Sequence, residues 1–235
     1  MYNGVMKIVI IISANAEWRV VKELHPNLSL QKSPFGDFAH LTLDTWHLTL
    51  FHGGWGKISA AATTQYVIDH FLPDLLINLG TCGGFAGRIE TGTIILVERT
   101  LVYDILEQMG GGAEAIEHYA TNIDLSWLVD DGKWLMDHEK MVRGLLVSAD
   151  RDIVVEDIPM LIEKYGAVAA DWESGAIAWV AKKNGTRLLI LRAVSDLVGG
   201  DGGEAYGNLE LFHARTKTMM KKLFDQLPGW LEIVA

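Results

Sequence analysis

The sequence has little of what secreted, membrane and nucleic-acid-binding proteins require. Its one cysteine, Cys82, excludes an intramolecular disulfide and a cysteine-rich zinc site. Its longest aliphatic run, Ile8 to Ile12, is far shorter than the ~20 residues of a membrane span, and its N-terminus lacks a signal-peptide pattern. Acidic residues outnumber basic ones by 30 to 20, and a net charge of −10 has the wrong sign for binding nucleic acid. These absences favour a cytoplasmic protein that acts on a small molecule, with no membrane or nucleic-acid partner.

What the chain does have is enough apolar material for a large core. Of its 235 residues, 49% are hydrophobic, which excludes intrinsic disorder. Only 5 residues are proline, and no linker, internal repeat or low-complexity segment divides the chain. We therefore expect one domain that extends over residues 1–235.

Short aliphatic runs alternate with amphipathic stretches along the chain. The patterns predict a hairpin at 38–43 and 46–51, further strands at 7–13, 75–79, 93–97, 144–147, 167–170 and 188–194, and helices at 16–24, 57–71, 156–165, 172–183 and 212–227. Near-continuous aliphatic strands separated by helices are typical of a parallel sheet covered on both faces. The predicted fold is α/β, with three α/β/α layers around a twisted, mostly parallel mixed sheet.

Several glycine-rich segments fit no known phosphate-binding motif. The segment 53–57 lacks the spacing of a phosphate loop, and Cys82 occupies the place of the first glycine of a dinucleotide fingerprint in 80–87. We interpret both as tight turns where the backbone approaches a ligand or another strand. Residues 110–141 are predicted to be an insertion or a lid, and residues 199–203 a mobile loop or a functional lid.

Three acidic residues stand where predicted strands end. They are Glu17, Glu173 and Asp196, and in an open sheet of this class ligands bind at the carboxyl ends of the strands. A helix cap or a solvated acid in the first helical turn explains any one of them alone. Three at one sheet edge indicate a binding site. Cys82 has no base beside it in the sequence and is best interpreted as a small buried hydrophobe. None of the 8 histidines has metal-site spacing.

Four segments resemble the nucleoside phosphorylase and nucleosidase superfamily, and within it the methylthioadenosine/S-adenosylhomocysteine nucleosidases. They occur in the family's order over about residues 7 to 227, and they are residues 7–14, 54–61, 73–84, and 171–173 with 192–196. The resemblance implies a nucleosidase that hydrolyses the N-glycosidic bond of adenosine-type nucleosides such as methylthioadenosine or S-adenosylhomocysteine. It also implies a homodimer and no metal or organic cofactor.

The resemblance also implies a role for particular residues. Asp196 is similar to the acid that protonates purine N7, Glu17 to the group that orients the attacking water, and Glu173 to the glutamate that accepts hydrogen bonds from the ribose hydroxyls. We expect Glu173 to stay ionised near a helix start, whereas Asp196 needs a raised pKa to act as an acid. The other residues that we expect to bind the substrate are Thr81, Gly83, Asp152, Ile153, Trp172, Ser195 and Phe212. Tyr103 is a further candidate for the pocket wall.

Several departures from the family pattern leave alternatives open. A one-residue choice of register assigns the catalytic glutamate to Glu17 or to Trp18. Trp172 replaces a methionine that usually lies under the ribose, and Asp152 stands near the place of a base-stacking phenylalanine. A nucleoside-binding protein that has lost turnover is therefore one alternative.

Phosphorolysis by the same fold is the other alternative. The related phosphorylases carry an arginine where this chain has Asn78, and the loop after the first strand lacks their Gly-Asp-Pro-x-Arg pattern. Arg19, Arg88 and Arg99 are the remaining candidates for holding an anion. The sequence therefore favours hydrolysis, and an acid that faces N7 favours a purine.

Overall fold

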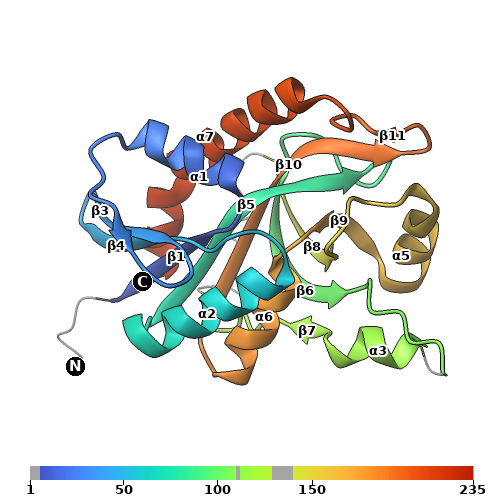
Figure 1. Ribbon diagram of the computed structural model, residues 1–235, viewed down its shortest axis with the longest axis horizontal. Coiled ribbons are helices and arrows are strands. Elements are labelled where there is room, and N and C mark those ends of the chain that lie inside the picture. The colour runs from blue at the N-terminus through green and yellow to red at the C-terminus, as the bar shows by residue number, and fades with distance from the viewer. Residues whose placement is uncertain (1–5, 110–111, 129–139, 235) are drawn as a thin grey trace.

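The computed structural model describes residues 6–109, 112–128 and 140–234 (Figure 1). An 11-stranded mixed sheet runs through it. Its strands are β1 (Ile8–Ile12), β2 (Gln31–Lys32), β3 (Asp37–Leu43), β4 (Trp46–His52), β5 (Leu75–Phe85), β6 (Ile94–Val102), β7 (Thr121–Asn122), β8 (Met141–Ser148), β9 (Ala167–Asp171), β10 (Leu188–Gly199) and β11 (Gly202–Gly203). The helical elements are α1 (Asn15–Leu24), α2 (Lys57–Phe71), α3 (Gly112–His118), a 3-10 turn η2 (Val155–Asp157), α5 (Ile158–Tyr165), α6 (Ser174–Lys183) and α7 (Leu209–Val234).

Helices cover both faces of the sheet, as the aliphatic strands predict. Helices α1 and α7 lie together on one face, and α2 and α6 on the other (Figure 1). Strand β1 shows the alternation that fills both layers, because Ile8 and Ile10 join the core under α1 and α7 while Val9 and Ile11 join the core under α2 and α6. The three-layer α/β/α architecture is therefore confirmed.

The sheet also closes partly on itself. Its longest ladders, β5 with β10 and β6 with β8, are parallel, and the shorter ones are mostly antiparallel. Strand β10 pairs with both β5 and β6, so that β10, β6, β8, β9 and β5 form a ring of neighbours. Strands of 11 and 12 residues, β5 and β10, are long enough to take part in both the open sheet and this ring.

The predicted hairpin, with Asp44 at φ 52°, is present, and the turn before α2 has Gly54 and Gly56 at positive φ. The turn predicted at residues 80–87 is wrong for Gly80, Gly83 and Gly84, whereas Gly87, at φ 80°, does lie in a turn after the strand. The first three glycines belong to β5, which extends to Phe85. A Cβ atom on Gly80 would lie 2.1 Å from Nη1 of Arg192, so this glycine makes room for a side chain that crosses the strand.

Two segments interpreted as loops contain regular structure. Residues 112–128 include α3 and β7, and β7 pairs with β6. The lid predicted within residues 110–141 falls partly on 110–111 and 129–139, which lie outside the described residues. Residues 199–203, predicted to be a mobile loop or a functional lid, form a hairpin, because Gly199 pairs with Gly202 across β10 and β11. In the described ranges, every helix is too short or too polar to cross a membrane. The extent of one domain over 1–235 stays a prediction.

Candidate active site

The predicted site residues surround one cavity of about 680 Å³. It lies beside the ends of β1, β9 and β10 and the beginning of α7, where chain segments distant in sequence meet. Glu17, Glu173 and Asp196 line it together with seven other predicted residues, namely Thr81, Gly83, Asp152, Ile153, Trp172, Ser195 and Phe212. Tyr103 does not line the cavity. It is buried, and the Arg151 guanidinium lies 5.3 Å from its ring centroid.

Glu17 belongs to the first turn of α1, and its carboxylate is directed into the protein. Its Oε1 accepts hydrogen bonds from the Thr81 amide at 2.5 Å and the Thr81 hydroxyl at 2.9 Å, and its Oε2 accepts one from the Ala14 amide at 3.2 Å. Trp18 is buried away from the cavity and stacks on His52, with ring centroids 5.4 Å apart. Glu17, and not Trp18, is therefore the residue of this pair that faces the cavity.

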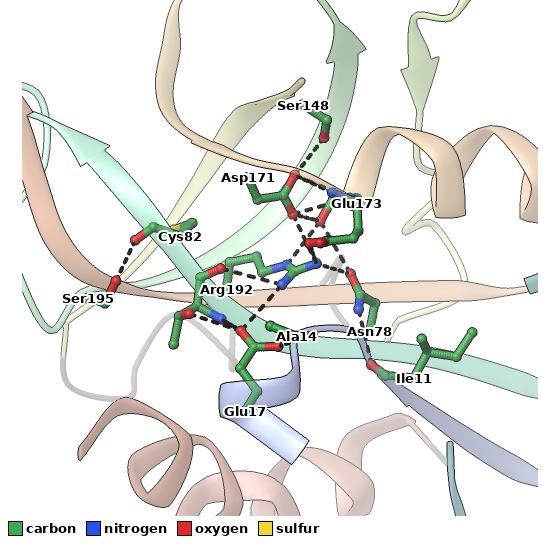
Figure 2. A network of polar contacts seen from close by, with 12 residues as sticks. Ile11, Ala14, Glu17, Asn78, Cys82, Ser148, Asp171, Glu173, Arg192 and Ser195 are labelled. Atoms are coloured by element: carbon green, nitrogen blue, oxygen red, sulfur yellow. Dashed lines mark hydrogen bonds and ion pairs between the residues drawn. The ribbon is translucent and has the colours of Figure 1, made fainter. Parts of the chain in front are cut away.

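The centre of the site is Arg192, to which the sequence assigned no role. Its side chain is 1% exposed and lies among the carboxylates of Glu17, Asp171 and Glu173 (Figure 2). Nη2 lies 2.9 Å from Asp171 Oδ2 and 3.7 Å from Glu173 Oε2, and Nη1 lies 3.9 Å from Glu17 Oε1. Burial alone would lower the pKa of Arg192, but the three carboxylates together raise it. A permanent positive charge thus fixes the positions of three acids.

Asn78 completes the surroundings of the guanidinium. Its Oδ1 accepts from Arg192 Nη2 at 2.8 Å, and its Nδ2 donates to the Ile11 carbonyl at 3.0 Å. The Arg192 Nε donates to the Ser174 hydroxyl at 3.0 Å. The place of the phosphorylase arginine is therefore occupied by a buried amide that holds Arg192. Of the other arginines considered, Arg19 lines the cavity and Arg99 forms an ion pair with Glu117 at 3.0 Å.

Glu173 precedes α6 but does not cap it. Asp171 takes that role, since its carboxylate accepts from the amides of Glu173 and Ser174. The Glu173 carboxylate turns instead toward α2, where the Gly56 amide donates to its Oε1 at 3.0 Å. Burial, reinforced by Asp171 and Glu17, raises the pKa of Glu173 to about 8 despite Arg192 and the Gly56 amide. Burial is the largest cause of this rise, which runs opposite to the prediction that Glu173 stays ionised. The carboxylate does not face the start of its own helix, which would have favoured the charged form.

Asp196 lies inside β10 rather than after it. The ladder between β10 and β5 shifts register between Val194 and Asp196, and such a bulge redirects side chains. The Ser195 hydroxyl donates to Asp196 Oδ1 at 2.6 Å. Burial raises the pKa of Asp196 and outweighs the opposite influence of Ser195 and Arg215. This is the direction that the sequence argument requires of a proton donor.

Gly83, which pairs with Asp196 across β5 and β10, lines the cavity together with Ile153. A Cβ atom on Gly83 would lie 2.8 Å from Ile153 Cδ1, so the glycine leaves room for that isoleucine. Tyr206, which the sequence analysis missed, donates from its hydroxyl to the Ile153 carbonyl at 2.9 Å. Burial raises the pKa of Tyr206 to about 12, and the negative charge of the exposed Asp152 adds to this rise.

Two tryptophans form the wall beside Glu173. The rings of Trp55 and Trp172 are stacked with centroids 5.6 Å apart and planes at 27°. Trp172 was predicted from the sequence, whereas Trp55 belongs to the segment 53–57, which was interpreted as a tight turn where the backbone approaches a ligand or another strand. That turn places it at the cavity, because Gly56 follows it and binds Glu173.

Neither the thiol of Cys82 nor a metal centre offers an alternative chemistry in the part of the chain that the structure describes. Burial raises the pKa of the Cys82 thiol well above its ordinary value, so the thiol stays protonated. Within residues 6–109, 112–128 and 140–234, histidine, cysteine and carboxylate side chains form no group of three or more that could hold a metal ion.

The fold and the site together define a class of protein. Residues 7–227 match the model of the phosphorylase superfamily, and the chain belongs to that family.

More particular likenesses are to proteins named 5′-methylthioadenosine/S-adenosylhomocysteine nucleosidase. The one from Buchnera aphidicola subsp. Schizaphis graminum is 27% identical over 230 residues, covering 94% of this chain and 97% of the relative. The one from Geobacillus kaustophilus is 28% identical over 72% of this chain and 75% of the relative. Among solved structures, a Streptococcus pneumoniae MTA/SAH nucleosidase in complex with 8-aminoadenine superposes with a TM-score of 0.78 at 20% identity, covering 97% of this chain and 100% of that chain. This likeness confirms the fold.

Proposed function

We propose that the protein is a purine nucleoside N-ribohydrolase that cleaves adenosine-type nucleosides such as methylthioadenosine or S-adenosylhomocysteine. The observation that carries the proposal is that Glu17, Glu173 and Asp196 line one cavity of about 680 Å³. The relatives named above act, by their names, on these two nucleosides. A cavity of this size is suited to a ligand of nucleoside dimensions.

Each carboxylate has a distinct task in the proposed reaction. Asp196 donates its proton to purine N7, and the electron pair of the C1′–N9 bond passes to the base. Glu173 accepts hydrogen bonds from the ribose hydroxyls, which favours its ionised form once the sugar is bound. Glu17 holds a water against C1′ and takes its proton as the new C–O bond forms. The products are the free base and the free sugar.

The surroundings of each acid support this division of roles. Burial raises the pKa of Asp196, which is the direction that a general acid requires. Glu17 is held in place by Thr81 and Ala14, so its position does not depend on the substrate. Arg192 holds Glu17 and Glu173 in one arrangement and is a positioning residue in this scheme.

Water is the proposed nucleophile, and phosphorolysis is the alternative. A phosphate dianion needs a dedicated set of donors, usually arginines. The buried guanidinium of Arg192 is already surrounded by carboxylates, and Asn78 occupies the position of the phosphorylase arginine.

The test is to incubate the purified protein with methylthioadenosine, with and without inorganic phosphate, and to separate the products by chromatography. We expect adenine and free methylthioribose at the same rate in both conditions. A phosphate-dependent reaction that yields the sugar 1-phosphate would establish the phosphorylase instead. Tight binding of an adenosine analogue without any base release would indicate the nucleoside-binding protein.

The proposal includes a homodimer in the cytoplasm. Large apolar side chains on the surface support the dimer, since Ile58 is 85% exposed and Met109 96% exposed. Exposed apolar patches commonly mark protein interfaces. Light scattering measures the mass directly, and an Ile58→Asp variant is expected to be monomeric.

A further inference from the structure

The strand that carries Asp196 is irregular at this acid. The ladder between β10 and β5 skips Ser195, which is the additional residue of a bulge between Val194 and Asp196. A bulge leaves its additional residue without ladder partners, so the direction of the next side chain depends on contacts from outside the ladder. Helix α7, which packs along β10, and the segment that joins β11 to α7 supply such contacts (Figure 1).

Glu204, in the segment before α7, holds the residue directly after Asp196 by two hydrogen bonds. Its amide donates to the Leu197 carbonyl at 3.0 Å, and its Oε2 accepts from the Leu197 amide at 3.0 Å. Arg215, on α7, donates from Nη1 to the same Oε2. The same Nη1 lies 3.5 Å from the carbonyl oxygen of Ser195. The two side chains therefore hold the backbone on both sides of the acid.

Arg215 and Glu204 also supply opposite charges beside Asp196. A hydrogen bond from Arg215 lowers the pKa of Glu204, so both members of the pair are charged. Cys82 of β5 and Tyr206 before α7 also lie near the acid, but burial raises the pKa of each, so both are neutral. Burial is the main cause of the raised pKa of Asp196, and of the two charges Arg215 lowers it while Glu204 raises it. Because the two charges oppose each other, the effect of burial on the acid is preserved.

The position of the pair excludes direct contact with a ligand in the cavity. Neither Arg215 nor Glu204 lines the cavity, and both side chains are partly exposed. An ion pair that is partly exposed adds little to the stability of a fold, so its effect on the neighbouring acid is the more important one.

We propose that Arg215 and Glu204 are positioning residues for the proton donor, because they hold the bulged backbone on both sides of Asp196 as a neutral pair. The inference rests on the proposed function, in which Asp196 protonates the base. Proton transfer depends on the placement of the acid, since a displacement of about 1 Å can cost on the order of 100-fold in rate.

Three substitutions separate the position of the acid from the charge beside it. Glu204→Gln keeps an oxygen that can accept from the Leu197 amide but removes the negative charge, whereas Glu204→Ala removes both. Arg215→Met removes the positive charge. The matched control is Lys217→Met on the same helix, which breaks an exposed ion pair with Glu23 outside the cavity lining. Circular dichroism checks that each variant is folded.

Carbon-13 NMR of the aspartate carboxyl groups measures the pKa of Asp196 without any substrate, and Asp196→Asn assigns its signal. We expect Arg215→Met to raise this pKa, because a negative charge then remains alone beside the acid. Glu204→Gln should lower it, because a positive charge remains alone. Each shift should be roughly half a pH unit or more, and Lys217→Met should leave the pKa unchanged. A role in folding alone would not produce shifts of opposite sign.

The rate of base release from methylthioadenosine tests the position of the acid. We expect kcat to fall about tenfold or more in Glu204→Ala, and Glu204→Gln to retain most of kcat at its own optimal pH. The dissociation constant of a C-nucleoside analogue of adenosine, whose carbon–carbon glycosyl bond cannot be hydrolysed, should stay within a few-fold of the wild type in both. The loss is thus expected in kcat and not in binding.

Two results would overturn the inference. One is an Asp196 pKa that is unchanged in Arg215→Met and Glu204→Gln or that moves in the same direction in both, and the other is a Glu204→Ala variant as active as Lys217→Met. If Arg215→Met does not fold, the two Glu204 variants decide the outcome.

The same measurements keep this inference separate from the proposed function. Opposite pKa shifts in a protein that releases no base would retain the hold on Asp196 and reject the hydrolase. Base release that none of the three substitutions changes would do the reverse.

Discussion

Arg192 Nη2 lies 2.9 Å from Asp171 Oδ2, and both side chains are almost completely withdrawn from solvent. Asp171 also accepts from the Ser148 hydroxyl at 2.6 Å and from the amides at the start of α6. The ion pair therefore joins β8, β9, β10 and α6 at one point. Attraction in a buried pair offsets the cost of removing both charges from water, so the loss of one partner leaves the other uncompensated.

Replacing Arg192 by methionine is expected to destabilise the protein severely. Arg192→Met leaves Glu17, Asp171 and Glu173 buried together without a cation, at a cost of about 3–5 kcal/mol. Urea unfolding at neutral pH measures this free energy. The control is Lys221→Met, which removes one end of an exposed i,i+4 pair with Asp225 and should cost at most about 0.5 kcal/mol. Equal stability of the two variants would show that the buried guanidinium does not hold the site together.

The proton donor can be tested with a change of a single functional group. Asp196→Asn keeps the shape of the side chain but removes the acid, so base release should fall at least ~100-fold. Binding of a C-nucleoside analogue, which needs no proton transfer, should remain within a few-fold of the wild type. The matched control is Asp201→Asn in the turn between β10 and β11, outside the cavity lining. Unchanged turnover in Asp196→Asn would remove this residue from the mechanism.

The layers and most helices follow from pattern alone. Helix α2 begins and ends where the sequence predicts. It starts at Lys57, directly after Gly56, and it is terminated by Leu72 and Pro73. The aliphatic runs of β1 and β5 are equally unambiguous, since strands buried on both faces need continuous apolar residues. Glu17 and Glu173 were located for a similar reason, since they follow the ends of β1 and β9, whereas Asp196 follows a predicted strand that in the structure continues to Gly199.

What the pattern could not reveal depends on contacts between distant segments. Gly80 to Phe85 continue a strand because Arg192, more than a hundred residues later, needs the space above Gly80. The bulge at Asp196 exists only in the pairing of β10 with β5. Trp55 lies at the cavity because the amide of the next residue, Gly56, donates a hydrogen bond to the Glu173 carboxylate. The hydrophobic periodicity of a single segment cannot predict such contacts between distant segments.

Glu173 should make the stability of the protein dependent on pH. Its folded pKa of about 8 exceeds the ordinary value of 4.5, so the folded state binds this proton more tightly than the unfolded state. The contribution to stability is full below pH 4.5 and is lost as the pH rises through about 8. Glu173→Gln removes the titration and should be more stable than the wild type at pH 9, by on the order of 2 kcal/mol.

Urea unfolding at pH 5, 7 and 9 measures this effect. Glu204→Gln is the control of opposite sign, because hydrogen bonds from Arg215 and from the Leu197 amide lower the pKa of Glu204. The stability that Glu204 contributes is present above its ordinary pKa and is lost at lower pH. Its variant should therefore gain nothing over the wild type at pH 9. A Glu173→Gln variant with the pH dependence of the wild type would contradict the raised pKa.

Gly80 is the position where one added methyl group should damage the site most. A Cβ atom there would lie 2.1 Å from Arg192 Nη1 and 2.8 Å from Glu17 Oε1. The guanidinium cannot move aside freely, because Asn78, Ser174 and Asp171 hold it. Gly80→Ala should therefore lower the thermal midpoint by several degrees or more, since a loss of about 1–3 kcal/mol is typical of overpacking. In Gly80→Ala protein that still folds, the rate of base release should fall by at least the same factor as the affinity for the nucleoside. Gly229→Ala in α7 is the matched control, because nothing lies within 4 Å of its added Cβ and alanine favours the helix. A Gly80→Ala variant as stable and active as Gly229→Ala would mean that Arg192 and Glu17 do not occupy the space above this glycine.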